Sequence, residues 1–286
     1  MPITPERGQL VFQKVERNLL KLASELKPES VHGFRTSVRR LQTLLEELKS
    51  ERNGNEKKLL KLISRIRKRA GKVRDLDVQL STLRSLKIPQ EPRRKTLLLQ
   101  DLIELRVQRE KRLRKALTKG MAREVRRRLK RAAKELSPDT LRDPLVVARE
   151  MMARVGAPQG PPTEEVLHQY RMVAKRARYA AELATRSAEV DEFIAQLKRA
   201  QDALGDWHDW LGLTQSAAKR LGDVHESPLV AVLHNVSGAK FRNAVAALSS
   251  SRLVRADLKR QPASSNKSRK QGAKTVAPVV PASSAA

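Results

Sequence analysis

Two stretches of this sequence, 31–48 and 167–184, overlay on one another without a gap. In the first, the apolar residues from Phe34 to Leu48 are separated in turn by 4, 3, 4 and 3 positions. That spacing places them on one face of an α-helix. The second stretch has an apolar residue at each corresponding position, beginning with Tyr170. An amphipathic helix that occurs twice, far apart in the chain, predicts an α-helical fold with an internal repeat.

Cations accompany the apolar seam in both helices. In the first, His32, Arg35 and Arg39 lie at successive turns, about 100° round from the seam. Arg35 and Arg39 are like charges at i and i+4, which costs an isolated helix about 0.2–0.5 kcal/mol. We therefore expect another group to offset their repulsion. The overlay sets His168, Arg171, Lys175, Arg176 and Arg178 against His32, Arg35, Arg39, Arg40 and Gln42.

The net charge of the chain indicates which classes of molecule it binds. Its 286 residues include 60 Lys and Arg against 31 Asp and Glu, a net charge of +29. An excess of this size predicts a polyanionic partner: nucleic acid, inorganic polyphosphate or anionic lipid headgroups. Aromatic residues make up only 3%, and the abundance of Leu, Ala, Arg, Lys and Glu favours helices over sheet. The lack of cysteine excludes disulfides and thiolate metal sites.

Breaks that contain proline or glycine divide the chain. We expect a single all-α domain over 6–260, with a first half at 6–137 and a second at 141–260. A basic tail rich in Ser, Ala and Pro, 261–286, is expected to be disordered. Each half is predicted to hold four helices. They span 8–26, 31–48, 56–86 and 93–136 in the first half, with an interruption at 118–120 left open, and 141–155, 164–186, 190–221 and 229–260 in the second.

A weaker match follows at nearly the same offset, between 70–78 and 204–212. Each stretch contains a glycine, then a cation and a carboxylate one turn later. A glycine costs a helix about 1 kcal/mol, so we expect each to permit close approach by another helix or by a ligand. If a pseudo-two-fold axis relates the halves, the cationic helices line one shared groove, and the carboxylates orient arginines. The matched pairs are Gly71 with Gly205, Arg74 with His208, and Asp75 with Asp209.

Four stretches together resemble a known family, the conserved-histidine α-helical domain, or CHAD. They are VHGFRTSVRRL at 31–41, AGKVRDLDV at 70–78, LHQYRMVAKRARYAAEL at 167–183 and LGDWHDW at 204–210. The resemblance implies two four-helix bundles related by pseudo-two-fold symmetry around a basic central pore. It also implies non-catalytic binding of inorganic polyphosphate and, as in some members, association with storage granules.

The resemblance carries over a set of polyphosphate-binding residues, and one position departs from it. Gln42 stands where the family usually has a cation, so the first cationic helix is expected to bind less strongly than the second. The residues carried over are His32, Arg35, Arg39, Arg40, Arg74, His168, Arg171, Lys175, Arg176, Arg178 and His208.

Two other functions remain open. The charge permits a nucleic-acid-binding protein, although few aromatic residues are present for base stacking and no nucleic-acid-binding motif is recognisable. His208 and Asp209 permit a metal-dependent phosphohydrolase, although the surrounding arginines disfavour a divalent cation. We expect no catalysis, cofactor or metal. Because no apolar run approaches about 18 residues and the N-terminus does not resemble a signal peptide, we also expect a cytoplasmic protein without a membrane span.

Overall fold

The computed structural model describes residues 3–87, 92–156 and 162–250. Within these ranges the secondary structure is helical, apart from an isolated bridge between Lys49 and Leu141, so the predicted all-α class is confirmed. No helix in the described ranges has the length and apolar character needed to cross a bilayer. The α-helices are α1 (Pro5–Ser24), α2 (Pro28–Thr43), α3 (Gly54–Ser85), α4 (Pro92–Ala116), α5 (Lys119–Lys134), α6 (Pro144–Val155), α7 (Glu164–Ala181), α8 (Ala188–Leu221) and α9 (Pro228–Ser250).

The first half contains five α-helices among its described residues, whereas four were predicted. The long helix expected at 93–136 is divided, because Thr118 caps the start of α5 by accepting a hydrogen bond from the backbone N–H of Met121. The additional helix packs against α1 and α3. The expected tail at 261–286, and residues 251–260 of the expected last helix, lie outside the described residues.

The apolar seams predicted from spacing are buried. Along 31–48 the α-helix ends at Thr43 and continues as a π-helical turn, Leu44–Leu48, yet all five seam residues from Phe34 onward are fully buried. The wider turn adds a residue without moving the seam off the core. In the second half the seam residues are at most 2% exposed: Tyr170, Ala174, Ala177, Ala181 and Ala184.

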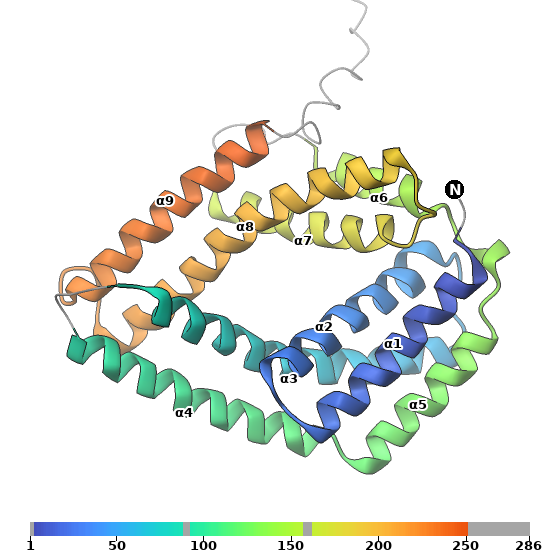
Figure 1. Ribbon diagram of the computed structural model, residues 1–286, viewed down its shortest axis with the longest axis horizontal. Coiled ribbons are helices and arrows are strands. Elements are labelled where there is room, and N and C mark those ends of the chain that lie inside the picture. The colour runs from blue at the N-terminus through green and yellow to red at the C-terminus, as the bar shows by residue number, and fades with distance from the viewer. Residues whose placement is uncertain (1–2, 88–91, 157–161, 251–286) are drawn as a thin grey trace, which may run out of the picture.

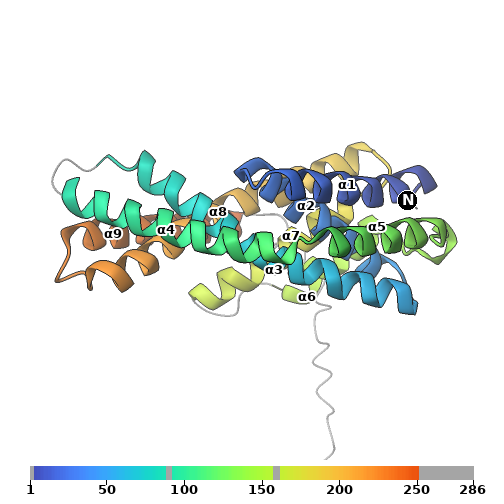
Figure 2. The same cartoon turned by 90° about the horizontal axis from the view of Figure 1, so that it is seen from below.

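The helices form a flat, elongated molecule, and in the view of Figure 1 the second half (α6–α9) lies above the first (α1–α5) (Figure 1, Figure 2). Within each half, consecutive helices pack together: α1 on α2, α2 on α3 and α3 on α4, and likewise α6 on α7, α7 on α8 and α8 on α9. Between the halves, α2 contacts α7 and α3 contacts α8. The four helices that carry the sequence repeat therefore meet one another, and α4 also contacts α8.

The buried core does not divide along the boundary between the halves. The largest apolar cluster joins residues such as Phe34 and Leu41 to Tyr170 and Ala177. A second cluster, at the end of the molecule where α4 and α9 lie, combines side chains of both halves. Its members include Leu80, Leu98, Leu102, Leu213, Leu229 and Leu233. The core therefore differs from two separate four-helix bundles, and it holds α2, α3, α7 and α8 against one another.

Candidate anion-binding site

A cationic pocket of about 420 Å³ lies among α2, α3, α7 and α8. We call it the central pocket. Five Arg and Lys side chains, three histidines and two carboxylates line it. The cationic stripes of the two repeated helices thus share one pocket. The predicted residues brought together are His32, Arg35 and Arg39 from α2, Arg74 from α3, His168, Arg171 and Lys175 from α7, and His208 from α8.

The wall formed by α2 and α3 is arranged around Arg35. Nη2 of Arg35 lies 3.9 Å from Oδ1 of Asp75, and the Arg35 side chain is 20% exposed. The guanidinium rests on Gly71, where an added Cβ would collide with it. The close approach predicted for this glycine is confirmed, because a larger residue would displace the arginine. His32 is exposed one turn earlier on α2.

The wall formed by α7 and α8 repeats this arrangement around Arg171. Nη2 of Arg171 lies 4.0 Å from Oδ1 of Asp209, and the arginine side chain is 13% exposed. The ring of His168 lies 5.5 Å from that of His208, centroid to centroid. Gly205, however, has open space where a Cβ would stand, and none of the described residues approaches it closely.

Burial makes several of these charges unfavourable in the free protein. Burial, reinforced by Arg171 and Arg39, lowers the pKa of Lys175 to about 7. Burial, together with Arg171, lowers the pKa of His208 to about 4. It likewise lowers the pKa of Arg35 and Arg171. The pKa of His32 is also lowered, because its surroundings in the pocket are partly desolvated, although the residue stays exposed, and because Arg74 lies nearby. An anion in the pocket would favour the charged form of each group.

Three polar atoms of residues that line the pocket are buried without a hydrogen-bond partner among the described residues. They are Nε of Arg171, Nδ1 of His208 and Oε1 of Gln79. A buried polar atom without a partner is costly, and such atoms often belong to sites that bind a ligand or water. The Arg171 Nε–H is a donor. The pocket therefore holds at least one donor that an acceptor oxygen would satisfy.

Three of the predicted cations do not line the central pocket. Arg40 and Arg178 both pair with Glu182, and Arg176 pairs with Glu47. Gln42 also lies outside the lining. Its side-chain amide donates a 3.1 Å hydrogen bond to the Ser64 hydroxyl. The position where a missing cation was expected to weaken the first helix is thus outside the pocket, as is its counterpart Arg178.

Among the residues in or near the pocket that were not identified from the sequence are one aromatic residue and one further cation. Tyr179 lines it from α7. Arg67 of α3 has a buried Nε without a partner among the described residues, and burial together with Arg39 lowers its pKa. Arg67, Gly71 and Arg74 lie at i, i+4 and i+7 on one face of α3, and this spacing could have drawn attention to Arg67.

The fold and pocket define a class: an all-helical protein in which two sequence-related helix pairs meet around a cationic cavity. The chain belongs to the CHAD family, since the CHAD domain model matches residues 8–218. It is similar to the crystal structure of the CHAD domain from the plant Ricinus communis, with 21% identity, 91% of each chain covered and a TM-score of 0.61. It is also similar to PptA from Streptomyces chartreusis, with 17% identity, 87% of this chain and 98% of that chain covered, and a TM-score of 0.63. At these identities the two structures show the fold. A search of curated proteins found no match.

Proposed function

We propose that the chain binds inorganic polyphosphate in the central pocket and does not turn it over. The observation that carries the proposal is that five Arg and Lys side chains from α2, α3 and α7 share the pocket with only two carboxylates, and that α8 adds a histidine. Membership of the CHAD family supports the same ligand class. The net excess of positive charge is inside a cavity, where it attracts a ligand more strongly than it would on an open surface.

The chemistry of polyphosphate suits these side chains. Its oxygens accept hydrogen bonds and its charge repeats along the chain. Arginine offers a rigid fork of donors, lysine a compact point charge, and histidine a donor that becomes charged beside an anion. Along one helix, cations at successive turns are about 5 Å apart, so they contact successive parts of a linear anion. The ligand would also offset the repulsion between Arg35 and Arg39.

Isothermal titration with polyphosphate tests the proposal. Replacing Arg35 and Arg171 with alanine, one on each wall, should weaken binding at least about a hundredfold, because two charge-assisted contacts are lost. The matched control is Arg123→Ala with Lys130→Ala, which removes the same charge from exposed positions of α5. The control should change affinity less than about threefold. Equal losses in both double variants would mean that overall charge, and not this pocket, binds the anion.

The two alternative functions make different predictions. A nucleic-acid-binding protein should release polyphosphate when RNA or DNA is added, whereas we expect long-chain polyphosphate to displace nucleic acid and the reverse to fail. A phosphohydrolase should release phosphate with Mg²⁺ or Mn²⁺ and lose this activity in His208→Ala. We expect no release, because Asp75 and Asp209 lie beside Arg35 and Arg171, and these arginines repel a divalent cation.

We also propose that a pseudo-two-fold axis relates the halves. The contacts of α2 with α7 and of α3 with α8 join corresponding helices, which is consistent with a two-fold axis between the halves. Rotation by about half a turn should superpose α2–α3 on α7–α8 in a crystal structure of the protein, and failure of that superposition would refute the symmetry. Cytoplasmic location and granule association stay predictions from the sequence.

A further inference from the structure

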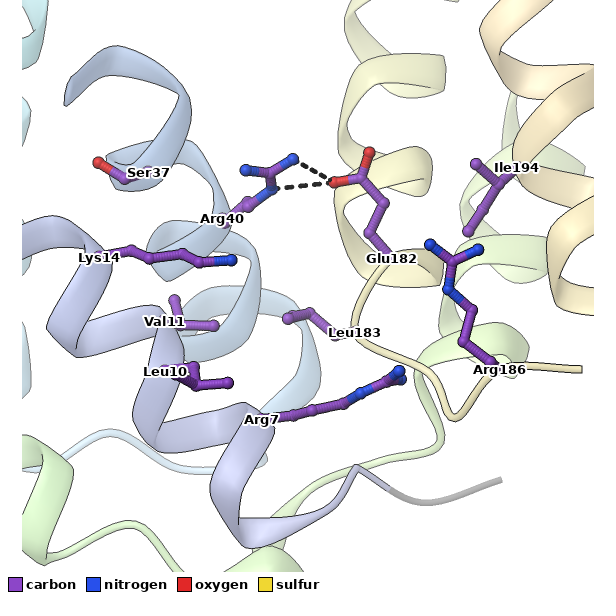
Figure 3. A pocket seen from close by; sticks show the side chains of 10 residues that line it. All are labelled: Arg7, Leu10, Val11, Lys14, Ser37, Arg40, Glu182, Leu183, Arg186 and Ile194. Carbon is purple, nitrogen blue, oxygen red and sulfur yellow. Dashed lines mark hydrogen bonds and ion pairs between the residues drawn. The ribbon is translucent and has the colours of Figure 1, made fainter. Parts of the chain in front are cut away.

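A second pocket of about 400 Å³ is formed by α1, α2, the C-terminal end of α7 with the segment that follows it, and α8 (Figure 3). We call it the side pocket. Four cations line it: Arg7, Lys14, Arg40 and Arg186. The carboxylate in its lining belongs to Glu182. Like the central pocket, it is a cavity with an excess of positive charge.

Glu182 receives two arginines. Nε and Nη2 of Arg40 lie 2.9 and 2.8 Å from its Oε2 (Figure 3). Nη1 of Arg178 lies 3.2 Å from its Oε1. The Glu182 side chain is 20% exposed. Proteins hold phosphoryl groups in a similar way, with one arginine that donates two hydrogen bonds and a second arginine that contacts another oxygen. The carboxylate therefore occupies a position that suits a phosphoryl group.

The two pockets adjoin each other at Tyr179, which lines the central pocket. The guanidinium carbons of Arg40 and Arg178 lie 5.8 and 5.5 Å from the centre of its ring. On α2, Arg39 lines the central pocket and the next residue, Arg40, lines the side pocket. Tyr179 and the adjacent residues Arg39 and Arg40 therefore link the two pockets, and at Arg40 a carboxylate of the chain itself neutralises the cation.

We propose that Glu182 is a specificity-determining residue that limits how much of a long polyphosphate the protein holds. Its carboxylate pairs with Arg40 and Arg178, which are then not available to the ligand. A polyphosphate bound in the central pocket therefore ends at Tyr179 and does not extend into the side pocket. This inference rests on the proposed function. A short ligand that fits the central pocket does not reach Glu182, and a long one meets it.

The test compares tripolyphosphate with long-chain polyphosphate in titrations of Glu182→Gln. Glutamine keeps the side chain's shape and an acceptor for Arg40 but removes the charge. Affinity for the long chain should rise about tenfold, the factor for one additional charge-assisted contact, while affinity for tripolyphosphate stays unchanged. Adding Arg40→Ala should abolish the gain, because that arginine is the new ligand.

Glu47→Gln is the matched control. Glu47 also joins the halves, pairing with Arg176 at 3.3 Å, its side chain is 24% exposed, and it lines neither pocket. It should leave both affinities unchanged. The inference is overturned if Glu182→Gln does not alter the ratio of the two affinities, or if Glu47→Gln or Arg40→Ala alone raises it equally, since loosening of the contact between halves would then be the cause. If the unaltered protein binds neither ligand, the proposed function itself fails.

Discussion

The two walls of the central pocket place similar groups at similar positions but give them different electrostatic properties. On both walls an exposed histidine precedes an arginine that lies about 4 Å from an aspartate of the neighbouring long helix: 3.9 Å for Arg35 and 4.0 Å for Arg171. The arginine of the α7–α8 wall is less exposed, 13% against 20%. The distance between arginine and aspartate is therefore nearly the same on both walls, whereas the exposed fraction of the arginine side chain differs.

The difference lies in which groups can lose their charge. At corresponding positions the α2–α3 wall has Arg39 and Arg74, whereas the α7–α8 wall has Lys175 and His208. Arginine keeps its charge at any ordinary pH, but Lys175 has a pKa of about 7 and His208 of about 4. At these two positions the α2–α3 wall therefore stays charged, whereas the α7–α8 wall gains charge when an anion binds.

The largest loss of polyphosphate affinity should come from replacing two cations of either wall. Arg35→Gln with Arg39→Gln, and Arg171→Gln with Lys175→Gln, should each weaken polyphosphate binding about a hundredfold, because one ligand contacts both walls. Titration calorimetry at fixed salt measures both, with the circular dichroism of the helices as a check on folding. A double variant that binds as tightly as the unaltered protein would show that its wall takes no part.

The two repeated glycines provide a smaller and sharper comparison. Gly71→Ala should weaken binding about tenfold, because the new methyl group moves the Arg35 guanidinium. Gly205→Ala is the matched control, since open space surrounds that position. Alanine should stabilise α8 by up to about 1 kcal/mol there and leave binding unchanged. Thermal unfolding and titration measure the two effects. Equal affinities of the two variants would contradict the assigned role of Gly71.

Because Lys175 of the α7–α8 wall has a pKa of about 7, polyphosphate affinity should depend on pH. Binding should be tightest below about pH 7, where Lys175 is already charged, and should weaken about fivefold by about pH 8.5, because the ligand must then draw a proton onto it. Histidines ordinarily titrate below this window. Lys175→Arg should remove the dependence, and Lys72→Arg, at an exposed position of α3, should retain it. A slope that survives in Lys175→Arg would assign the proton to another group.

The same lowered pKa affects the stability of the free protein. An unfolded lysine holds its proton up to about pH 10.4, whereas Lys175 in the fold releases it near pH 7. The unfolded state binds more protons between these values, so stability falls as pH decreases from the upper value to the lower one. The melting temperature without ligand should accordingly rise from about pH 7 to pH 9, and less so in Lys175→Gln.

The smallest effects are expected at 42 and 178. Arg178→Ala and Gln42→Arg should each change affinity less than about twofold, since Arg178 is paired with Glu182 and Gln42 with Ser64 outside the central pocket. The same titrations measure them. A tenfold gain in Gln42→Arg would instead support the sequence-based expectation that a missing cation weakens the first helix.

The helical period explains which features of the fold and of the site could be predicted from the sequence. It determines which residues share a face, so the buried seams and the stripes of Arg35 and Arg171 follow from spacing. The pair of Arg178 and Glu182 also has the i, i+4 spacing of one helix. The partners of Arg40 and Arg176 do not follow from spacing, because each lies in the other half of the molecule: Glu182 after α7, and Glu47 on the π-helical turn after α2. Their positions depend on how the halves pack. For the same reason the two glycines looked equivalent in sequence but have different surroundings.

The central claim is that both walls hold one ligand, and a crystal structure of the protein with tripolyphosphate tests it most directly. The account predicts a single bound chain in the central pocket, with phosphoryl oxygens in hydrogen-bond contact with both Arg35 and Arg171. Ligand bound to one wall alone, or on the basic surface of α5 with the central pocket empty, would contradict it.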